Sequence, residues 1–193
     1  MAHRTAAELE EERLEILAAQ RDRAAFATLY ERYVDQIHAY AYTLTHDMEQ
    51  ANDVTAATFT RAIEELPRFQ WRGVPYSAWL YRVAANLVSR ERRRPGWIEL
   101  EPRMLPDARA DPALQAEEGS RADEVRAAVA GLPHDQRQAI LLRFGGDLRN
   151  REIADVMGRS EGAVKLLTFR ALTALRRRLG APLPAERLTR SGS

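Results

Sequence analysis

The sequence has no cysteine among its 193 residues, which excludes disulfides, iron–sulfur clusters and thiolate-ligated zinc within this chain. Histidine is also scarce, and the four that occur are scattered without the spacing that metal ligands share. We expect all four to be structural or solvated, and we predict neither a metal site nor a cofactor. The histidines are His3, His38, His46 and His134.

Long apolar runs are missing as well. No stretch of about 18 apolar residues occurs, and residues 1–15 have no apolar signal core. The sequence therefore predicts neither a membrane span nor a secretory signal, and we expect a cytoplasmic protein. It also lacks a glycine-rich phosphate loop and a Ser/His/Asp arrangement, so we expect no enzymatic activity and no small-molecule substrate.

Charge is nearly balanced overall, with a formal net charge of +1, but it is uneven along the chain. Residues 61–94 carry 8 arginines against 3 acidic residues, and residues 121–193 carry 14 basic against 8 acidic residues. Residues 95–120 between them carry 2 arginines against 6 acidic residues. Two basic blocks around an acidic one indicate two nucleic-acid contacts joined by an acidic tether.

Apolar residues recur at helical spacing, which predicts an all-α fold of two small helical domains joined by a proline-rich linker. We expect helices over 5–20, over 22–44 and over 76–94, and a further helix that Asp47 caps and Pro67 ends. The predicted divisions are an N-terminal helical extension (1–21), a first domain (22–95), an acidic linker (96–120), a second domain (121–179) and a tail (180–193).

Several side chains of these helices are expected to face a core. We expect Pro133 in the first turn of a helix that runs through Phe144. The anchors predicted for the first two helices are Leu9, Ile16 and Leu17, and then Phe26, Leu29, Tyr30, Tyr33, Val34, Ile37, Tyr40, Ala41 and Leu44.

The loop RFQWRGVP at 68–75 mixes arginine with aromatic residues, the combination that holds unstacked bases of single-stranded nucleic acid. The helix after it ends in Arg90 and Arg92–Arg94, where a phosphate backbone could bind. A melted strand is therefore a candidate ligand. The alternative is that these aromatics are core or rim residues and the arginines a solvated helix end, and the segment alone does not decide between them.

The clearest local motif lies further along the chain. A short apolar helix around Glu152–Met157 leads into a Gly158-Arg159-Ser160 turn, and Ser160 is suited to cap a second helix. This is the layout of a helix-turn-helix, whose second helix enters the major groove of DNA. The alternative is an αα-hairpin with no DNA role, but Lys165, Arg170 and the Arg176–Arg178 run favour DNA.

Together, the two halves resemble an extracytoplasmic-function (ECF, group IV) RNA polymerase sigma factor of the primary sigma family. The first half is similar to sigma domain two in the segments FATLYERY, ANDVTAATFTRAIEELPRF and YSAWLYRVAANLVSRERRR. The second half is similar to sigma domain four in the segments LPHDQRQAILLRF, EIADVMGRSEGAVK and FRALTALRRRL. The similarity covers about residues 22–179.

The resemblance implies a protein without chemistry of its own that binds core RNA polymerase, at its clamp coiled coil and its flap, and directs it to promoter DNA. An anti-sigma factor typically masks this class. The family usually has Glu where Asn52 stands and Gln-Glu where Ala56 and Ala57 stand, so we expect weaker docking or a greater reliance on the remaining positions. The implied docking residues are Asp53, Val54, Ala57, Thr58 and Arg61.

The resemblance also implies two DNA surfaces. The loop captures a base of the minus-10 element, and the second helix of the helix-turn-helix reads the minus-35 element. The residues implied for minus-10 binding are Arg68, Phe69, Trp71, Arg72, Tyr76, Asn86, Arg90, Arg93 and Arg94. Those implied for minus-35 binding are Arg159, Ser160, Glu161, Lys165, Leu166, Phe169 and Arg170.

Two further expectations concern DNA and the linker. Leu166 and Leu167 stand where the family commonly has Ser-Arg, which predicts an altered minus-35 preference through thymine methyl contacts. We interpret Arg149, Arg151 and Arg159 as phosphate contacts. The acidic linker either threads the polymerase cleft, as the resemblance implies, or simply keeps the chain soluble.

A free-standing helix-turn-helix regulator is the main rival interpretation. It would bind a duplex without a partner, as a dimer on a palindromic site. A sigma factor would bind free DNA weakly and gain specificity when core polymerase is added.

Overall fold

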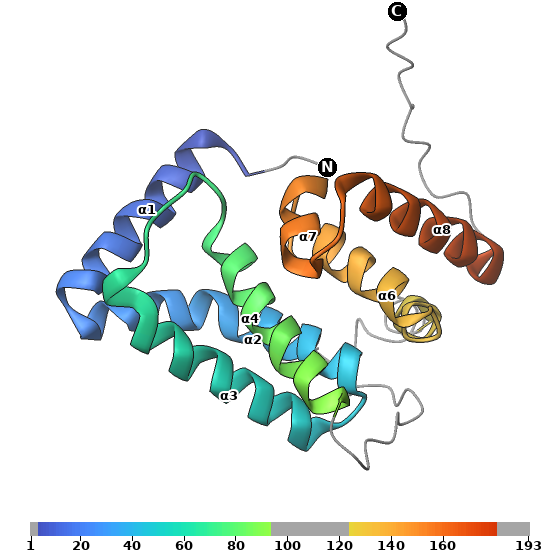
Figure 1. Cartoon of the computed structure of the whole chain (residues 1–193), viewed down its shortest axis with the longest axis horizontal. Coiled ribbons are helices and arrows are strands. Elements are labelled where there is room, and N and C mark those ends of the chain that lie inside the picture. Colours follow the sequence, from blue (N-terminus) through green and yellow to red (C-terminus); the bar gives the residue numbers. More distant parts are fainter. Residues whose placement is uncertain (1–3, 94–123, 181–193) are drawn as a thin grey trace, which may run out of the picture.

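The computed structural model describes residues 4–93 and 124–180, and every regular element in these two ranges is helical (Figure 1). The predicted all-α fold is confirmed. The elements are α1 (Ala6–Arg21), η1 (Arg23–Ala25), α2 (Phe26–Thr45), α3 (Met48–Glu65), η2 (Leu66–Arg68), α4 (Tyr76–Arg92), α6 (His134–Ile140), η3 (Leu141–Gly145), α7 (Asn150–Met157) and α8 (Glu161–Leu179), with a further helical stretch at 124–130.

Side-chain caps fix where three of these helices begin. Thr5 and Glu8 form a reciprocal capping box at α1, the Asp47 carboxylate accepts from the backbone N–H of Gln50 at 3.0 Å, and Ser160 caps α8. Each cap satisfies backbone donors that the first helical turn leaves without partners. The predicted capping roles of Asp47 and Ser160 are confirmed.

Helices α2, α3 and α4 pack around the first core, and α1 lies across one end of this bundle (Figure 1). Leu29, Ile37 and Leu80 are fully buried there, and each such side chain stabilises the fold by about 1.5–3 kcal/mol. The predicted inward position of Tyr30 is wrong, because its side chain is 44% exposed. Its ring instead packs edge-on against Phe59 at a centroid distance of 4.8 Å.

The anchors of α1 differ in part from the prediction. Ile16 is buried as expected, whereas Leu9 and Leu17 are only half-buried. Glu12, four residues before Ile16, is also fully buried, although it is an acidic side chain that the apolar pattern gave no reason to place inside. Glu12 is therefore a feature of the fold that periodicity missed.

The second group of helices shares a core with the first. Leu142, Ile153 and Val164 belong to the same buried cluster as the first bundle, and α7 packs against α4. Polar contacts join the groups as well: the Arg137 guanidinium donates to the carbonyl oxygen of Thr43 at 2.9 Å, and it also contacts the imidazole of His46. A small separate cluster lies between the 124–130 helix, α6 and α8, and comprises Ala128, Leu132, Ile140, Ala171 and Leu175.

Helix α6 departs from the prediction at both ends. Pro133 is the residue before the first helical turn, not a residue of that turn. At the other end, the helix expected to run through Phe144 changes after Ile140 into the π-helical turn η3. The predicted linker 96–120, the first residues of the predicted second domain and the predicted tail beyond Gly180 lie outside the described residues.

Candidate nucleic-acid interface

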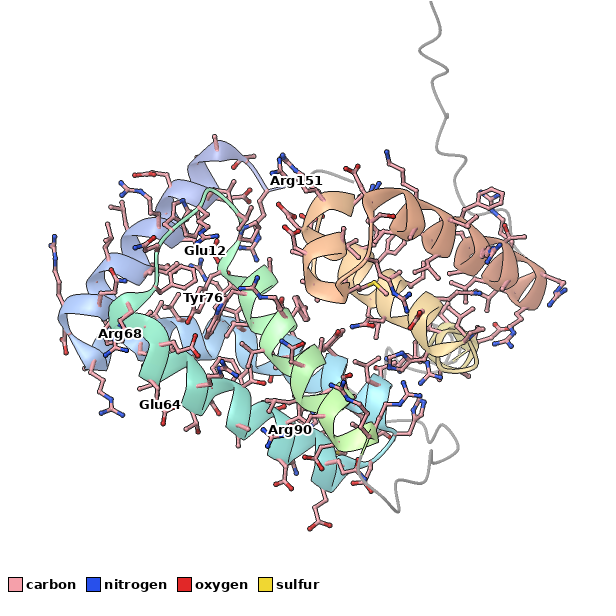
Figure 2. All side chains as sticks on the ribbon, viewed as in Figure 1. Glu12, Glu64, Arg68, Tyr76, Arg90 and Arg151 are labelled. Atoms are coloured by element: carbon pink, nitrogen blue, oxygen red, sulfur yellow. The ribbon has the colours of Figure 1, made fainter. Side chains whose placement is uncertain are left out.

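The predicted loop connects η2 to α4 and displays its arginines. Arg68 and Arg72 are exposed, while Trp71 is half-buried against the core. Gly73 has a φ of +73°, a left-handed conformation that glycine adopts without strain. Figure 2 shows Arg68 at the beginning of this loop, where α3 and η2 end.

An aromatic cluster supports the loop from beneath. The ring of Tyr76 stacks on Trp79 with centroids 5.6 Å apart, and Phe69 meets Tyr76 edge-on at 5.0 Å. Tyr76 is only 1% exposed, so the prediction that its side chain contacts DNA is wrong in this structure. Burial also raises the pKa of the Tyr76 phenol, which therefore stays neutral at physiological pH. Tyr76 supports the surface instead of forming it.

The loop faces a cavity of about 930 Å³ whose opposite wall belongs to α7. Both signs of charge line it, so the cavity is a mixed electrostatic environment and not a purely basic one. The arginines expected to clamp phosphates, Arg149 and Arg151, lie on this wall. Arg82, to which no sequence motif pointed, also lines the cavity, three residues after Trp79 on α4. The charged lining residues are Glu64, Glu65, Arg68, Arg72, Arg82, Arg149, Arg151, Glu152 and Asp155.

The C-terminal half of α4 extends the basic surface. Asn86, Arg90 and Arg93 are exposed and follow one another at i, i+4 and i+7, so they share one face of the helix. The Arg93 guanidinium donates to the carbonyl oxygen of Ser89 at 3.1 Å. Arg94 lies outside the described residues.

Helix α8 carries the second predicted surface. Leu166 is 47% and Phe169 61% exposed, and Lys165 and Arg170 project beside them. Gly158 takes the left-handed conformation in the turn, with φ of +61°, and the Ser160 hydroxyl accepts from the backbone N–H of Ala163 at 3.2 Å. The turn-and-cap layout predicted from the sequence is confirmed.

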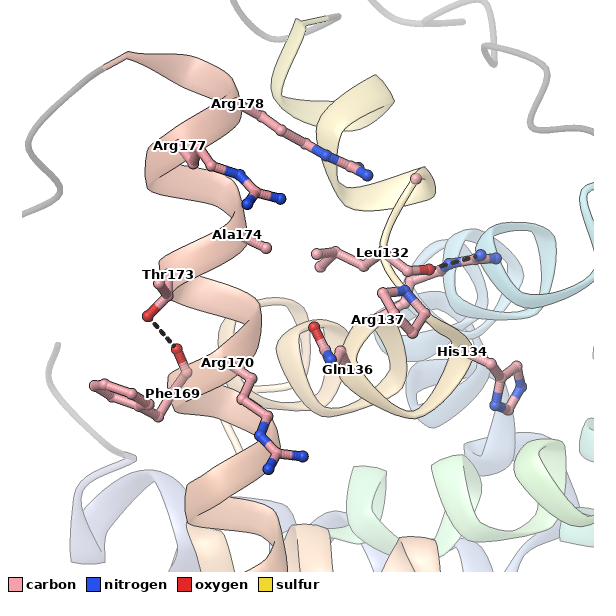
Figure 3. Close-up of a pocket in the computed structure, with 12 residues that line it drawn as sticks. Leu132, His134, Gln136, Arg137, Phe169, Arg170, Thr173, Ala174, Arg177 and Arg178 are labelled. Atoms are coloured by element: carbon pink, nitrogen blue, oxygen red, sulfur yellow. Dashed lines mark hydrogen bonds between the residues drawn. The ribbon is translucent and has the colours of Figure 1, made fainter.

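Charged residues at the start of α8 have partners within the protein. Lys165 lies 3.3 Å from the Glu161 carboxylate, and Arg159 lies 2.7 Å from that of Asp135. These pairs are exposed and weak, about 0–1 kcal/mol each, so a phosphate group can compete for the cations. Beside this surface lies a groove of about 820 Å³ between α6 and α8 (Figure 3), with Arg170, Arg177 and Arg178 along the α8 side.

The docking positions predicted on α3 divide into exposed and buried residues. Asp53, Ala57 and Arg61 are exposed at successive intervals of four residues and form one stripe. Val54 and Thr58 are 5% and 0% exposed, so their predicted direct contacts with a partner are wrong in this structure. The Thr58 hydroxyl instead donates to the carbonyl oxygen of Val54 at 2.7 Å.

One departure from the family pattern has a structural counterpart. The side-chain oxygen of Asn52 lies 3.0 Å from the imidazole of His38 on α2. At this position the chain makes an internal contact between two helices.

Neither a metal site nor a membrane span emerges from the described parts of the chain. Within 4–93 and 124–180, no three His, Cys, Asp or Glu side chains come together as metal ligands could. Over the same residues, no helix is both long and apolar enough to cross a bilayer.

A helix-turn-helix in one half and an arginine-rich aromatic loop in the other define an all-helical, two-module DNA-binding protein. Two family matches follow the same division: residues 29–98 match Sigma-70 region 2, and residues 122–175 match Sigma-70, region 4. The chain belongs to the ECF RNA polymerase sigma factors.

Similar curated proteins support the assignment to this family. The chain is 32% identical to the ECF RNA polymerase sigma factor BldN of Streptomyces coelicolor over 80% of its own length and 60% of that protein's. It is 34% identical to the RNA polymerase sigma-H factor of Pseudomonas aeruginosa over 80% of its length and 86% of the relative's. The first comparison thus spans less than two thirds of that relative.

A solved structure shares the fold. The sigma factor RpoE of Bartonella quintana, crystallised with the anti-sigma factor NepR, superposes with a TM-score of 0.66 at 22% identity, covering 82% of this chain and 98% of that one. At this level of identity, the similarity concerns the fold alone.

Proposed function

We propose that this chain binds core RNA polymerase and directs it to promoters, with α8 reading the minus-35 duplex and the 68–75 loop reading the melted minus-10 strand. The observation that carries the proposal is that the two exposed basic surfaces lie on separate segments, one matching sigma region 2 and the other sigma region 4. A sigma factor has to engage two promoter elements at once, and a single DNA-binding surface would not serve.

At the minus-10 element, Arg68 and Arg72 provide positive charge for the strand's phosphates, and Trp71 provides a ring for an unpaired base. The face of α4 formed by Asn86, Arg90 and Arg93 continues this path. Extruding a base costs a few kcal/mol, least where the duplex is already melted. Binding energy from the arginines offsets that cost.

At the minus-35 element, the N-terminal half of α8 enters the major groove. Lys165 and Arg170 donate hydrogen bonds to base edges, and Leu166 and Phe169 make apolar contacts with thymine methyl groups. Arg159, Ser160 and Glu161 at the start of the helix lie nearest the backbone and the first base pairs. We therefore expect the base preference at the minus-35 element to favour positions that contain thymine.

Core polymerase docks on the exposed α3 stripe of Asp53, Ala57 and Arg61. The polymerase performs the catalysis, so the chain needs no chemistry of its own, and it works in the cytoplasm beside that enzyme. An anti-sigma factor controls access to these surfaces, and the finer placement in group IV of the primary sigma family belongs to the same proposal. These assignments are supported by family membership together with the exposure of the stripe.

Run-off transcription with core polymerase tests the proposal. We expect promoter-specific transcripts only when the chain is added, and a gel shift of promoter DNA that becomes specific only with core polymerase present. Specific duplex binding by the chain alone, without any gain from the polymerase, would instead favour the free-standing regulator.

A further inference from the structure

We propose that helix α1 positions the loop that reads the minus-10 element. Its residues Glu12 and Gln20 hold the two ends of the 68–75 loop in place. The inference rests on the proposed function and adds two positioning residues to it. Helix α1 ends at Arg21, upstream of the segment 29–98 that matches sigma region 2.

Glu12 holds the far end of the loop. Its side chain is 0% exposed, and its Oε1 accepts from the backbone N–H of Tyr76 at 3.2 Å. Tyr76 is the first residue of α4, and the residue before it, Pro75, makes no side-chain cap. Glu12 therefore caps α4 from another helix, with a negative charge at the positive end of the helix dipole. Figure 2 shows Glu12 beside Tyr76, between α1 and the beginning of α4.

Two further donors fix the Glu12 carboxylate. The Arg4 guanidinium lies 3.0 Å from Oε1, and the hydroxyl of Tyr33 donates to the same oxygen. A buried carboxylate is stable only when it is paired and hydrogen-bonded in this way. Glu12 thus joins α1, α2 and α4 at one point, which places the start of α4 relative to the rest of the bundle.

Gln20 holds the near end of the loop. Its side-chain amide donates to the carbonyl oxygens of Leu66 at 2.9 Å and Phe69 at 2.8 Å. Both carbonyls belong to the turn from which the loop departs. Glu12 and Gln20 are eight residues apart, about 12 Å along one helix, so a single rigid element sets the separation of the two loop ends.

This arrangement matters because the loop itself has little regular structure. Between η2 and α4 its backbone forms no helix, and Gln70, Arg72 and Val74 are exposed. The position of Trp71 therefore depends on its packing against the core and on where the loop ends are held. Releasing an end alters which bases the loop accepts, and it does so without touching DNA.

Hydrogen exchange of the purified chain tests the anchoring directly. In E12Q and Q20A we expect faster exchange of the amides from 66 to 80, with α8 unchanged. E11Q, an exposed neighbour on the same helix, is the matched control. Unchanged exchange of the loop in both variants would overturn the anchoring.

Selectivity at the promoter tests the consequence. A promoter is first selected from a random template pool with wild-type chain and core polymerase, and a derivative is made with one minus-10 base changed. We expect the ratio of transcripts from the two templates to fall about tenfold in E12Q, as expected when a charge-assisted hydrogen bond is replaced by a weaker neutral one. E11Q should keep the wild-type ratio.

The ratio of the two transcripts distinguishes a loss of loop positioning from a general loss of folded protein. A variant that is merely less folded lowers both transcripts together and leaves the ratio unchanged, and that result would overturn the proposal. If the wild-type chain gives no promoter-specific transcript at all, the proposed function itself has failed. That failure is distinct from one in which wild type transcribes and E12Q remains fully selective.

Discussion

The two surfaces proposed to bind DNA are built in different ways. The α8 surface is formed by residues close together in sequence. A left-handed Gly158, the Ser160 cap and α8 itself place the side chains expected to contact the minus-35 bases. The 68–75 loop is placed from a distance, by hydrogen bonds from Glu12 that span 64 residues of sequence and from Gln20 that span 46 and 49. Helical geometry alone fixes the first surface, whereas the second depends on the packing of the whole bundle.

This difference explains how far the sequence could predict each surface. Periodicity and capping residues were enough for α8, for the Asp47 cap and for most of the first core. The family resemblance, not periodicity, implied binding roles for Tyr76, Val54 and Thr58, although the structure buries all three. Their burial depends on which helix packs over them, and a residue-by-residue comparison with the family carries no such information.

The largest effect should come from the core beneath the loop. Leu80→Ala removes a fully buried side chain from α4, and we expect it to lower the free energy of unfolding by about 2–5 kcal/mol. Because both modules share this core, chemical denaturation should show one transition for the whole chain. Leu14→Ala, at a position 55% exposed, should change stability by less than about 0.5 kcal/mol. Two separate transitions would contradict a shared core.

A smaller effect should follow from the cap of the local surface. Ser160→Ala removes the acceptor for the Ala163 N–H and should cost about 1 kcal/mol, measured by denaturation. It should also weaken minus-35 binding, while minus-10 selectivity stays intact. Ser160→Asp keeps a capping oxygen and should restore stability. If the aspartate variant is as unstable as the alanine variant, the cap is not what organises this turn.

Replacing one arginine of the Arg176–Arg178 run, which we expect to contact DNA phosphates, should have a still smaller effect. Arg176 is exposed in the last turn of α8, and Arg176→Ala should reduce the log-log salt dependence of holoenzyme binding by about 0.9. Affinity should fall alike on all sequences. Phe169→Ala should instead change the minus-35 preference and leave the salt slope as it was. A change of base preference in the Arg176 variant would contradict the interpretation that this side chain contacts DNA phosphates.

The smallest effect concerns pH. Burial lowers the pKa of His134 below 6.5, and the nearby Arg92 on α4 and Arg137 on α6 act in the same direction, against the opposing influence of Asp135. The unfolded chain therefore binds a proton more readily than the folded one. Above about pH 6.5 His134 is neutral in both states and the full stability of the fold is present. Part of that stability is lost as the pH falls from 6.5 toward the lowered pKa of His134 in the folded chain.

Denaturation midpoints between pH 7 and pH 5 measure this effect. His134→Gln should flatten the loss of stability over that interval. An identical slope in wild type and His134→Gln would show that other groups govern the acid response.

Photo-crosslinking tests most directly whether both surfaces engage one promoter under the control of the polymerase. Trp71 and Phe169 are each replaced, in separate variants, by a photoreactive phenylalanine analogue, and the crosslinked nucleotides are mapped. We predict that with core polymerase the residue at 71 crosslinks to the melted minus-10 strand and the residue at 169 to the upstream minus-35 duplex, and that the first crosslink disappears without polymerase. Equal crosslinking from both positions in the absence of polymerase would contradict the account.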